Sequence, residues 1–265
     1  MSELIFDWNK RRLSSLLGQT EIILVDETLR DGVQSPTVND PDLDQKKQLV
    51  RLMDQMGIGV VDVGLPGAGQ RAKDHVLELV KLIRDENLSI VPYCAARTLE
   101  ADIAPIADVQ QETGHPVEVY AFIGSSPVRQ YTENWTVESI AQISEKAIRF
   151  GVDQGLTVAY VTEDTTRSRP DQLRVMFDRA IEAGAARLVL CDTCGHSTPH
   201  GVRQLVQFTV DFIECSAVDV GLDWHGHNDR GLALANTLAA AEAGATRIHG
   251  TALGVGERVG NTSIV

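Results

Sequence analysis

The sequence has little of what marks a secreted, membrane-spanning or disulfide-stapled protein. No run approaches the ~18 consecutive apolar residues of a membrane-spanning helix. The first twenty residues mix acidic and basic side chains into a short apolar patch, a pattern that does not predict a signal peptide. Four cysteines in 265 residues do not suggest a disulfide scaffold, so we expect a reducing, cytoplasmic environment.

Basic residues are also scarce. The chain has 24 Lys+Arg against 37 Asp+Glu, a formal net charge of −13. Nucleic acids and anionic membranes need a basic surface, so neither is expected as a partner. Hydrophobic residues make up 43% of the chain, which allows a large core and excludes disorder over most of it. An anionic substrate would have to be attracted locally by arginines, a metal or helix N-termini.

Eight short apolar, β-branched runs recur along the chain, each followed by a polar loop and then a helical pattern. Their starts lie roughly 27–40 residues apart, which is the spacing of strand–helix units rather than of hairpins. Each run is continuously apolar, as expected of parallel strands that are covered on both faces. The predicted strands are Ile22–Val25, Ile58–Val63, Ile90–Cys94, Val117–Ile123, Thr157–Val161, Arg187–Cys191, Val218–Trp224 and Arg247–Thr251.

Between these runs, apolar residues recur with a helical period, and several of the segments end at a glycine. The predicted helices are Leu43–Met56, Ala72–Glu86, Val137–Gln154, Pro170–Ala183, Thr198–Glu214 and Leu232–Ala243. Eight strands alternating with helices predict an α/β fold, a (β/α)8 TIM barrel over residues 21–265. An open doubly wound sheet is the structural alternative, because periodicity alone does not separate the two.

The two ends of the chain carry expectations of their own. Residues 1–20 predict an amphipathic helix, Leu4–Leu17, outside the barrel. The eighth predicted strand ends near Thr251, and only Asn261–Val265 remain to begin an eighth helix. We therefore expect an eighth helix that is truncated or missing, which favours the chain being a shortened form of a longer protein.

A His-x-His pair, His225 and His227, ends the seventh predicted strand. Side chains two residues apart on a strand point the same way, so both imidazoles can reach one cation. Asp31, after the first strand, would add a carboxylate in a closed barrel. The alternative is that one of the histidines is a packed or surface residue. Mixed imidazole and oxygen ligands suit Mn²⁺, Zn²⁺, Co²⁺ or Mg²⁺ and do not choose among these metals.

Three motifs follow predicted strands in order: DETLRDGVQSP at 26–36, HGHNDRG at 225–231 and GVGERVGN at 254–261. Together they resemble the 2-isopropylmalate synthase, homocitrate synthase and citramalate synthase family, whose superfamily includes 3-hydroxy-3-methylglutaryl-CoA lyase. The resemblance extends from about residue 21 to the end of the chain. It implies a metal-dependent barrel that carries out a Claisen-type condensation of acetyl-CoA with a 2-oxo acid.

The resemblance also implies roles for individual residues. The implied divalent-metal ligands are Asp31, His225, His227 and Asn261. Arg30 resembles the arginine that polarises the ketone oxygen, and Glu163 resembles the glutamate implicated in acid–base catalysis. Thr193 matches a substrate-contacting threonine, and Glu257 and Arg167 are further candidates for substrate binding. Alternatively, Glu163 forms an ion pair with Arg167, four residues on.

Positions at which this sequence differs from the family pattern indicate which reaction and which substrate are expected. The loop 254–261 has no cysteine where the resembling lyases carry one, which favours a synthase. Ala159 stands where homocitrate synthases place an arginine for a distal carboxylate. This favours an apolar 2-oxo acid such as 2-oxoisovalerate or pyruvate, and an enzyme most like 2-isopropylmalate synthase of leucine biosynthesis. Citramalate synthase, homocitrate synthase and the lyase stay as alternatives. Arg129 replaces an expected histidine and could bind a second anion such as a CoA phosphate, or be a solvated loop charge.

The resembling synthases extend beyond the barrel into regions that supply a histidine and a tyrosine across a dimer. The sequence lacks these regions, so an inactive fragment or an oxo acid-binding relative is an alternative of another class, and a homodimer is the expected assembly. Cys191 and Cys194 are interpreted as packing or substrate-contacting residues rather than a redox pair. His249 has no motif around it and is expected to be a surface or hydrogen-bonded residue.

Overall fold

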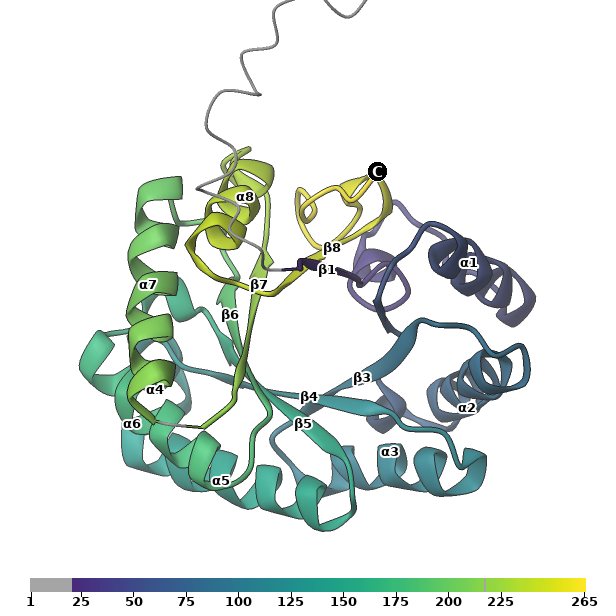
Figure 1. Ribbon diagram of the computed structural model, residues 1–265, viewed down its shortest axis with the longest axis horizontal. Helices are drawn as coiled ribbons and strands as arrows, with labels where there is room; N and C mark the ends of the chain where they lie inside the picture. Colours follow the sequence, from purple (N-terminus) through teal and green to yellow (C-terminus); the bar gives the residue numbers. More distant parts are fainter. Residues whose placement is uncertain (1–20, 217) are drawn as a thin grey trace, which may run out of the picture.

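The computed structural model describes residues 21–216 and 218–265 and shows a closed barrel of eight parallel strands in the order of the sequence (Figure 1). The barrel closes where β1 pairs with β8, from Ile23 opposite Arg247 to Asp26 opposite Gly250. This pairing confirms the predicted (β/α)8 barrel and excludes the open sheet. The strands are β1 Ile23–Asp26, β2 Val60–Asp62, β3 Val91–Arg97, β4 Glu118–Gly124, β5 Thr157–Glu163, β6 Arg187–Asp192, β7 Gly221–Gly226 and β8 Arg247–Gly250.

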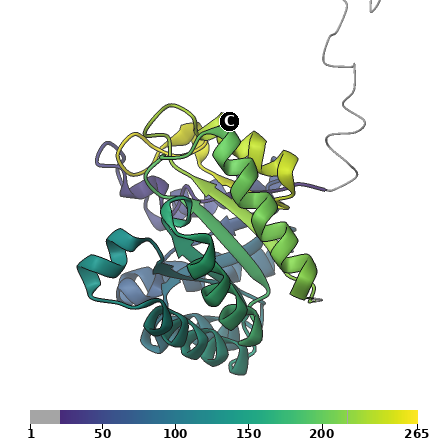
Figure 2. The same cartoon turned by 90° about the vertical axis from the view of Figure 1, so that its left-hand side faces the viewer.

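Helices surround the barrel and connect its strands. They are α1 Leu43–Gln55, α2 Gln70–Asp85, α3 Glu100–Thr113, α4 Pro127–Glu133, α5 Val137–Asp153, α6 Pro170–Glu182, α7 Pro199–Ser216 and α8 Ala233–Ala243. The short α4 is an insertion between β4 and α5, and the view in Figure 2 shows it on the same side as the loops after β1 and β8. The loops that follow the strands therefore share one end of the barrel.

The helices begin and end where local chemistry favours it. Asp42 starts α1 with a capping box, because its side chain accepts a hydrogen bond from the Gln45 backbone while the Gln45 side chain accepts one in return. Thr136 and Ser139 do the same for α5. Gly57 follows α1 with φ +79°, a left-handed conformation that glycine adopts at little cost.

The core has two parts, as expected of a barrel covered by helices. The larger part lies between the sheet and the helices. The smaller part fills the inside of the barrel with inward-pointing side chains from several strands: Val25, Val60, Tyr93, Tyr120, Ala159, Val189 and Cys191. Every second residue of each strand therefore points toward the barrel axis. The inward-pointing residues near the carboxyl ends of the strands line the end of the barrel where a site is expected.

The predicted segments match the structure closely, with two omissions. All eight predicted strands overlap observed ones, and each of the six predicted helices is present with its ends shifted by a few residues. The helices α3 and α4 were not predicted. Pro105 interrupts the sequence pattern of α3, and α4 is only seven residues long.

The ends of the chain differ in what the structure describes. The predicted helix Leu4–Leu17 lies outside the described residues. After β8, within residues 251–265, the chain forms a 3-10 turn, Ala252–Gly254, and a bridge between Thr251 and Ser263 rather than an α-helix. Among the described residues, no helix combines the length and the apolar character needed to cross a membrane.

Candidate metal and substrate site at the mouth of the barrel

A cavity of about 350 Å³ opens at the carboxyl ends of the strands. Side chains from β3, β4, β5, β6, β7 and β8 line it, together with residues from the segments that follow β1, β6, β7 and β8. This is the end at which TIM barrels place their active sites. Seven of the ten candidate site residues line the cavity: Arg30, Asp31, Glu163, Thr193, His225, His227 and Glu257.

Two histidines and one carboxylate converge beside this cavity. His225 and His227 are buried at the end of β7, and their Nε2 atoms lie 3.1 Å apart. Asp31 Oδ2 lies 3.7 Å from the first of these nitrogens and 3.8 Å from the second. Two ligand atoms that each lie about 2.1 Å from one cation are about 3.0 Å apart at right angles and up to about 4.2 Å apart on opposite sides, so all three separations are compatible with a single divalent cation.

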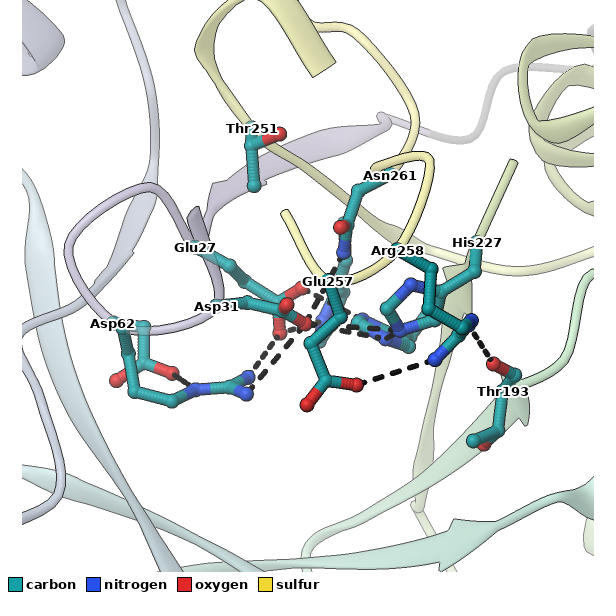
Figure 3. A network of polar contacts seen from close by, with 12 residues as sticks. Glu27, Asp31, Asp62, Thr193, His227, Thr251, Glu257, Arg258 and Asn261 are labelled. Carbon is teal, nitrogen blue, oxygen red and sulfur yellow. Dashed lines mark hydrogen bonds and ion pairs between the residues drawn. The ribbon is translucent and has the colours of Figure 1, made fainter. Parts of the chain in front are cut away.

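Asn261 completes this group from the loop after β8 (Figure 3). Its Nδ2 donates to Asp31 Oδ2 at 3.1 Å, and a backbone bridge to His227 holds it in place. Asp31 Oδ1, Asn261 Oδ1 and His227 Nδ1 are buried without a hydrogen-bond partner among the described residues. A half-turn of the amide would set Asn261 Oδ1 beside Asp31 Oδ2. Two adjacent oxygens and two facing imidazole nitrogens form a donor set that fits a divalent cation.

Gly256 explains how the loop after β8 reaches so close. A Cβ atom at this position would overlap Asn261 Oδ1 and would lie 3.5 Å from Asp31 Oδ1. Only a residue without a side chain therefore lets the backbone pass this near to the two oxygens.

Glu27 is a central residue of the site that the sequence analysis did not identify. Its Oε2 accepts from His225 Nδ1 at 2.6 Å, and its Oε1 accepts from the Tyr93 hydroxyl at 2.8 Å and from His249 Nδ1 at 3.0 Å. Burial alone would raise the pKa of Glu27, but its pairing with His225 and His249 holds this pKa well below its usual range. The one signal available in the sequence was its place two residues after Val25, whose side chain points into the barrel near the end of β1.

His249 lies directly beneath Glu27 on β8 and is almost completely buried. Its Nε2 atom lies 3.2 Å from Asp223 Oδ2, so the imidazole bridges two carboxylates. Burial alone would lower the pKa of His249, but Glu27 and Asp223 raise it to about 9. The expectation of a hydrogen-bonded residue is confirmed, whereas the alternative of a surface residue is wrong.

The charge on His249 should make stability depend on pH. Its pKa is about 9 in the folded protein and ~6.5 when unfolded, so its stabilising effect is complete below pH ~6.5 and is lost as the pH rises through 9. The expected loss is at most about 3 kcal/mol. Urea unfolding of the metal-free protein and of His249→Gln at pH 6, 8 and 9.5 measures it. Parallel pH profiles for the two proteins would contradict the prediction.

Arg30 is held at the rim of the cavity by three acidic side chains. Its Nε donates to Asp62 Oδ2 at 2.7 Å, and its Nη atoms lie 3.2 Å from Glu27 Oε1 and 3.5 Å from Asp31 Oδ2. Burial alone would lower the pKa of Arg30, but these carboxylates raise it well above its usual value. The guanidinium is thus a fixed positive charge next to the candidate metal ligands.

Glu163 ends β5 on the opposite wall of the cavity. Burial raises the pKa of its carboxyl group, although Arg129 Nε lies 3.4 Å from Oε1. Arg129, which is about 40% exposed, also pairs with Glu133 at 3.2 Å. The alternative pairing of Glu163 with Arg167 is wrong, because Arg167 pairs with Asp164 at 2.7 Å.

The loop after β8 is fastened across the mouth by Arg258. This side chain donates to the Thr193 carbonyl at 2.6 Å and lies 3.2 Å from Glu257 Oε2 (Figure 3). It also donates to Asp229 Oδ1 at 2.7 Å. Thr193 Oγ1 also accepts from the Asp164 backbone at 2.8 Å. Thr193 and Glu257, two residues predicted to bind the substrate, both line the cavity.

Other predicted residues lie elsewhere. Arg129 and Arg167 are not among the residues that line the cavity. Cys191 is buried on its wall, whereas Cys194 is exposed and lies 3.3 Å from Arg167. Both cysteines are free thiols in the structure.

A closed parallel barrel with histidines, carboxylates and an arginine around one cavity at its carboxyl end is the arrangement of a TIM-barrel enzyme. The chain belongs to the HMGL-like family, whose profile matches residues 21–265.

Curated relatives include a probable 2-isopropylmalate synthase of Methanopyrus kandleri, 34% identical over 91% of this chain and 46% of that protein. Another is a 2-isopropylmalate synthase of Sulfurisphaera tokodaii, 32% identical over 94% of this chain and 61% of that protein. The chain thus spans about half the length of the curated relatives it matches.

Among solved structures, hydroxymethylglutaryl-CoA lyase from Pseudomonas aeruginosa has a TM-score of 0.74 at 20% identity, covering 92% of this chain and 83% of that one. An HMG-CoA lyase from Acinetobacter baumannii, in complex with coenzyme A and 3-methylmalate, has a TM-score of 0.69 at 20% identity, covering 92% and 80%.

Proposed function

We propose that this barrel catalyses a Claisen-type condensation of acetyl-CoA with an apolar 2-oxo acid, most like 2-isopropylmalate synthase. The observation that carries the proposal is the convergence of Asp31, His225 and His227 beside Arg30 in one cavity, with Glu163 on the facing wall. Relatives at 30–34% identity that are named 2-isopropylmalate synthase support it. A place in leucine biosynthesis, a cytoplasmic location and a homodimer are part of the same proposal.

The divalent cation would be held by four side chains: Asp31, His225, His227 and Asn261. When bound, it supplies Lewis-acid polarisation of the oxo acid. The donor set accommodates Mn²⁺, Mg²⁺, Zn²⁺ or Co²⁺. The positive charge that the chain itself contributes is Arg30, which lies beside Asp31 and stabilises negative charge developing on the ketone oxygen.

Glu163 is the proposed general base, or the residue that orients it. Its carboxyl group lines the cavity, and burial raises its pKa toward the range in which a carboxylate removes a proton efficiently. The proton it takes is one from the methyl group of acetyl-CoA. Thr193 and Glu257 are proposed to contact the substrate from the rim.

The walls of the cavity favour an apolar side chain on the oxo acid. The residues lining it from β3 to β6 include Ala95, Phe122, Val161 and Val189. No lysine or arginine of β3–β6 is among the described lining residues, so a distal carboxylate would have no cationic partner there. This supports 2-oxoisovalerate or pyruvate over 2-oxoglutarate as the substrate.

A single assay separates these reactions. Release of CoA is measured with acetyl-CoA and a panel of 2-oxo acids (2-oxoisovalerate, pyruvate and 2-oxoglutarate), with and without Mn²⁺ or Mg²⁺. We expect metal-dependent release with an apolar oxo acid. Cleavage of 3-hydroxy-3-methylglutaryl-CoA without any condensation would instead identify a lyase. Saturable binding of metal and oxo acid with no CoA released would show that the barrel alone is inactive.

A further inference from the structure

Beneath the candidate metal ligands, a continuous set of buried polar side chains runs down the inside of the barrel. It connects β1, β7 and β8 through Glu27, His225, His249 and Asp223, and each of the four is buried. We propose that Glu27 and His249 are positioning residues. They hold the His225 imidazole in its Nδ1–H form, so that the free electron pair on Nε2 points toward the position where a cation would lie between His225, Asp31 and His227. The inference rests on the proposed metal site.

The first step of the argument is the direction of the hydrogen bond to His225. Glu27 Oε2 and His225 Nδ1 lie 2.6 Å apart. The other carboxylate oxygen, Oε1, receives the Tyr93 hydroxyl at 2.8 Å and an Arg30 nitrogen at 3.2 Å. With donors on its second oxygen, Glu27 serves as an acceptor, so the proton of the short bond resides on His225 Nδ1. Nε2 is then unprotonated, as a metal ligand must be.

The second step concerns what keeps Glu27 in place. His249 lies between two carboxylates, with Nδ1 at 3.0 Å from Glu27 Oε1 and Nε2 at 3.2 Å from Asp223 Oδ2. Asp223 is itself held by Arg187 Nε at 2.6 Å and by the Tyr120 hydroxyl at 2.8 Å. Together with Tyr93 of β3, these contacts tie the Glu27 carboxylate to five strands: β3, β4, β6, β7 and β8.

The same residues could be mistaken for a second metal centre, because Glu27, His225 and His249 also gather their ligand atoms closely. Their polar atoms, however, already pair with one another at hydrogen-bond distances. Within these two groups, the buried side-chain atoms without a hydrogen-bond partner are Asp31 Oδ1, His227 Nδ1 and Asn261 Oδ1, and none of them belongs to Glu27, His225 or His249. Glu27 and His249 therefore support the site, and the metal-binding site itself is formed by Asp31, His225, His227 and Asn261.

Glu27→Gln tests the inference, with Glu118→Gln as its matched control. Glu118 is also a carboxylate of the barrel wall, paired with Arg247, but it makes no contact with Glu27, His225 or His249. A glutamine has a single acceptor oxygen, which cannot serve both His225 and the donors on the other side. Two readouts are used: the His225 tautomer in the metal-free protein, from long-range ¹H–¹⁵N correlation spectra, and calorimetric titration with Mn²⁺ alone.

In the wild type and in Glu118→Gln we expect His225 in the Nδ1–H form and equal Mn²⁺ affinity. In Glu27→Gln we expect that form to be lost and Mn²⁺ to bind about 10–100-fold more weakly. His249→Gln should shift both readouts in the same direction by a smaller factor.

An Nε2–H form of His225 in the wild type overturns the inference, and so does wild-type Mn²⁺ affinity in a folded Glu27→Gln. If Glu27→Gln does not fold, His249→Gln and the wild-type spectrum decide. If the wild type does not bind Mn²⁺, that result contradicts the proposed function. The His225 tautomer is measured in the metal-free protein, so it tests this inference separately.

Discussion

Replacing His227 with alanine should abolish Mn²⁺ binding and metal-dependent release of CoA. Its Nε2 atom lies 3.1 Å from that of His225 and 3.8 Å from Asp31 Oδ2, so the substitution removes one of the converging donor atoms. Burial next to His225 lowers the pKa of His227 to about 4, and the imidazole is therefore neutral and free to bind a cation at pH 7. We expect an affinity at least ~100-fold below that of the wild type.

The measurement is a calorimetric Mn²⁺ titration, followed by the CoA-release assay. His200→Ala is the matched control, because it removes an exposed histidine of α7 that lies outside the cavity. It should leave both affinity and turnover unchanged. Undiminished Mn²⁺ affinity in folded His227→Ala would remove His227 from the proposed ligand set.

Replacing Glu163 with glutamine should lower kcat by about 10²–10⁴-fold while leaving Mn²⁺ affinity unchanged. A glutamine keeps the shape of the side chain but cannot accept the proton from the methyl group of acetyl-CoA. Because burial raises the pKa of Glu163, the wild-type rate should fall as the pH drops through a value above the usual ~4.3 for glutamate. The amide variant should lose this acidic limb from its residual rate.

Glu133→Gln is the control for that substitution. Glu133 and Glu163 both pair with Arg129, at 3.2 Å and 3.4 Å, but Glu133 does not line the cavity. Steady-state kinetics from pH 4.5 to 9 on the three proteins measure the effect. Equal kcat values for Glu163→Gln and Glu133→Gln would assign Glu163 to an ion pair instead of to catalysis.

Much of the fold could be predicted because parallel strands and amphipathic helices leave strong local patterns. The eight apolar runs, the His-x-His pair and the glycine-rich loop are all short-range signals. Glu27 and His249 leave no such signal, since each is a single polar residue within or beside an apolar run. They lie 222 residues apart in the chain and meet only because the barrel closes. Their pairing is a property of the closed sheet, which a local pattern does not contain.

The alternative prediction of an ion pair between Glu163 and Arg167 was wrong for a different reason. A spacing of four residues brings side chains together on an α-helix, but the chain after β5 is not α-helical there. Asp164 has φ +62°, and a 3-10 turn over Thr165–Arg167 follows. This turn directs Arg167 back onto Asp164 and leaves Glu163 to Arg129, which lies in the first turn of α4.

The pairing of β1 with β8 has a consequence for how the protein is made. On the ribosome, β1 is synthesised more than two hundred residues before the strand that covers its edge. At 5–20 residues per second, that edge stays unpaired for roughly 10–45 s. An open strand edge is a template for aggregation during this interval, and slow closure of distant contacts prolongs the exposure. Variants that weaken β8 should therefore reduce the yield of the protein in cells before they reduce the activity of the molecules that fold.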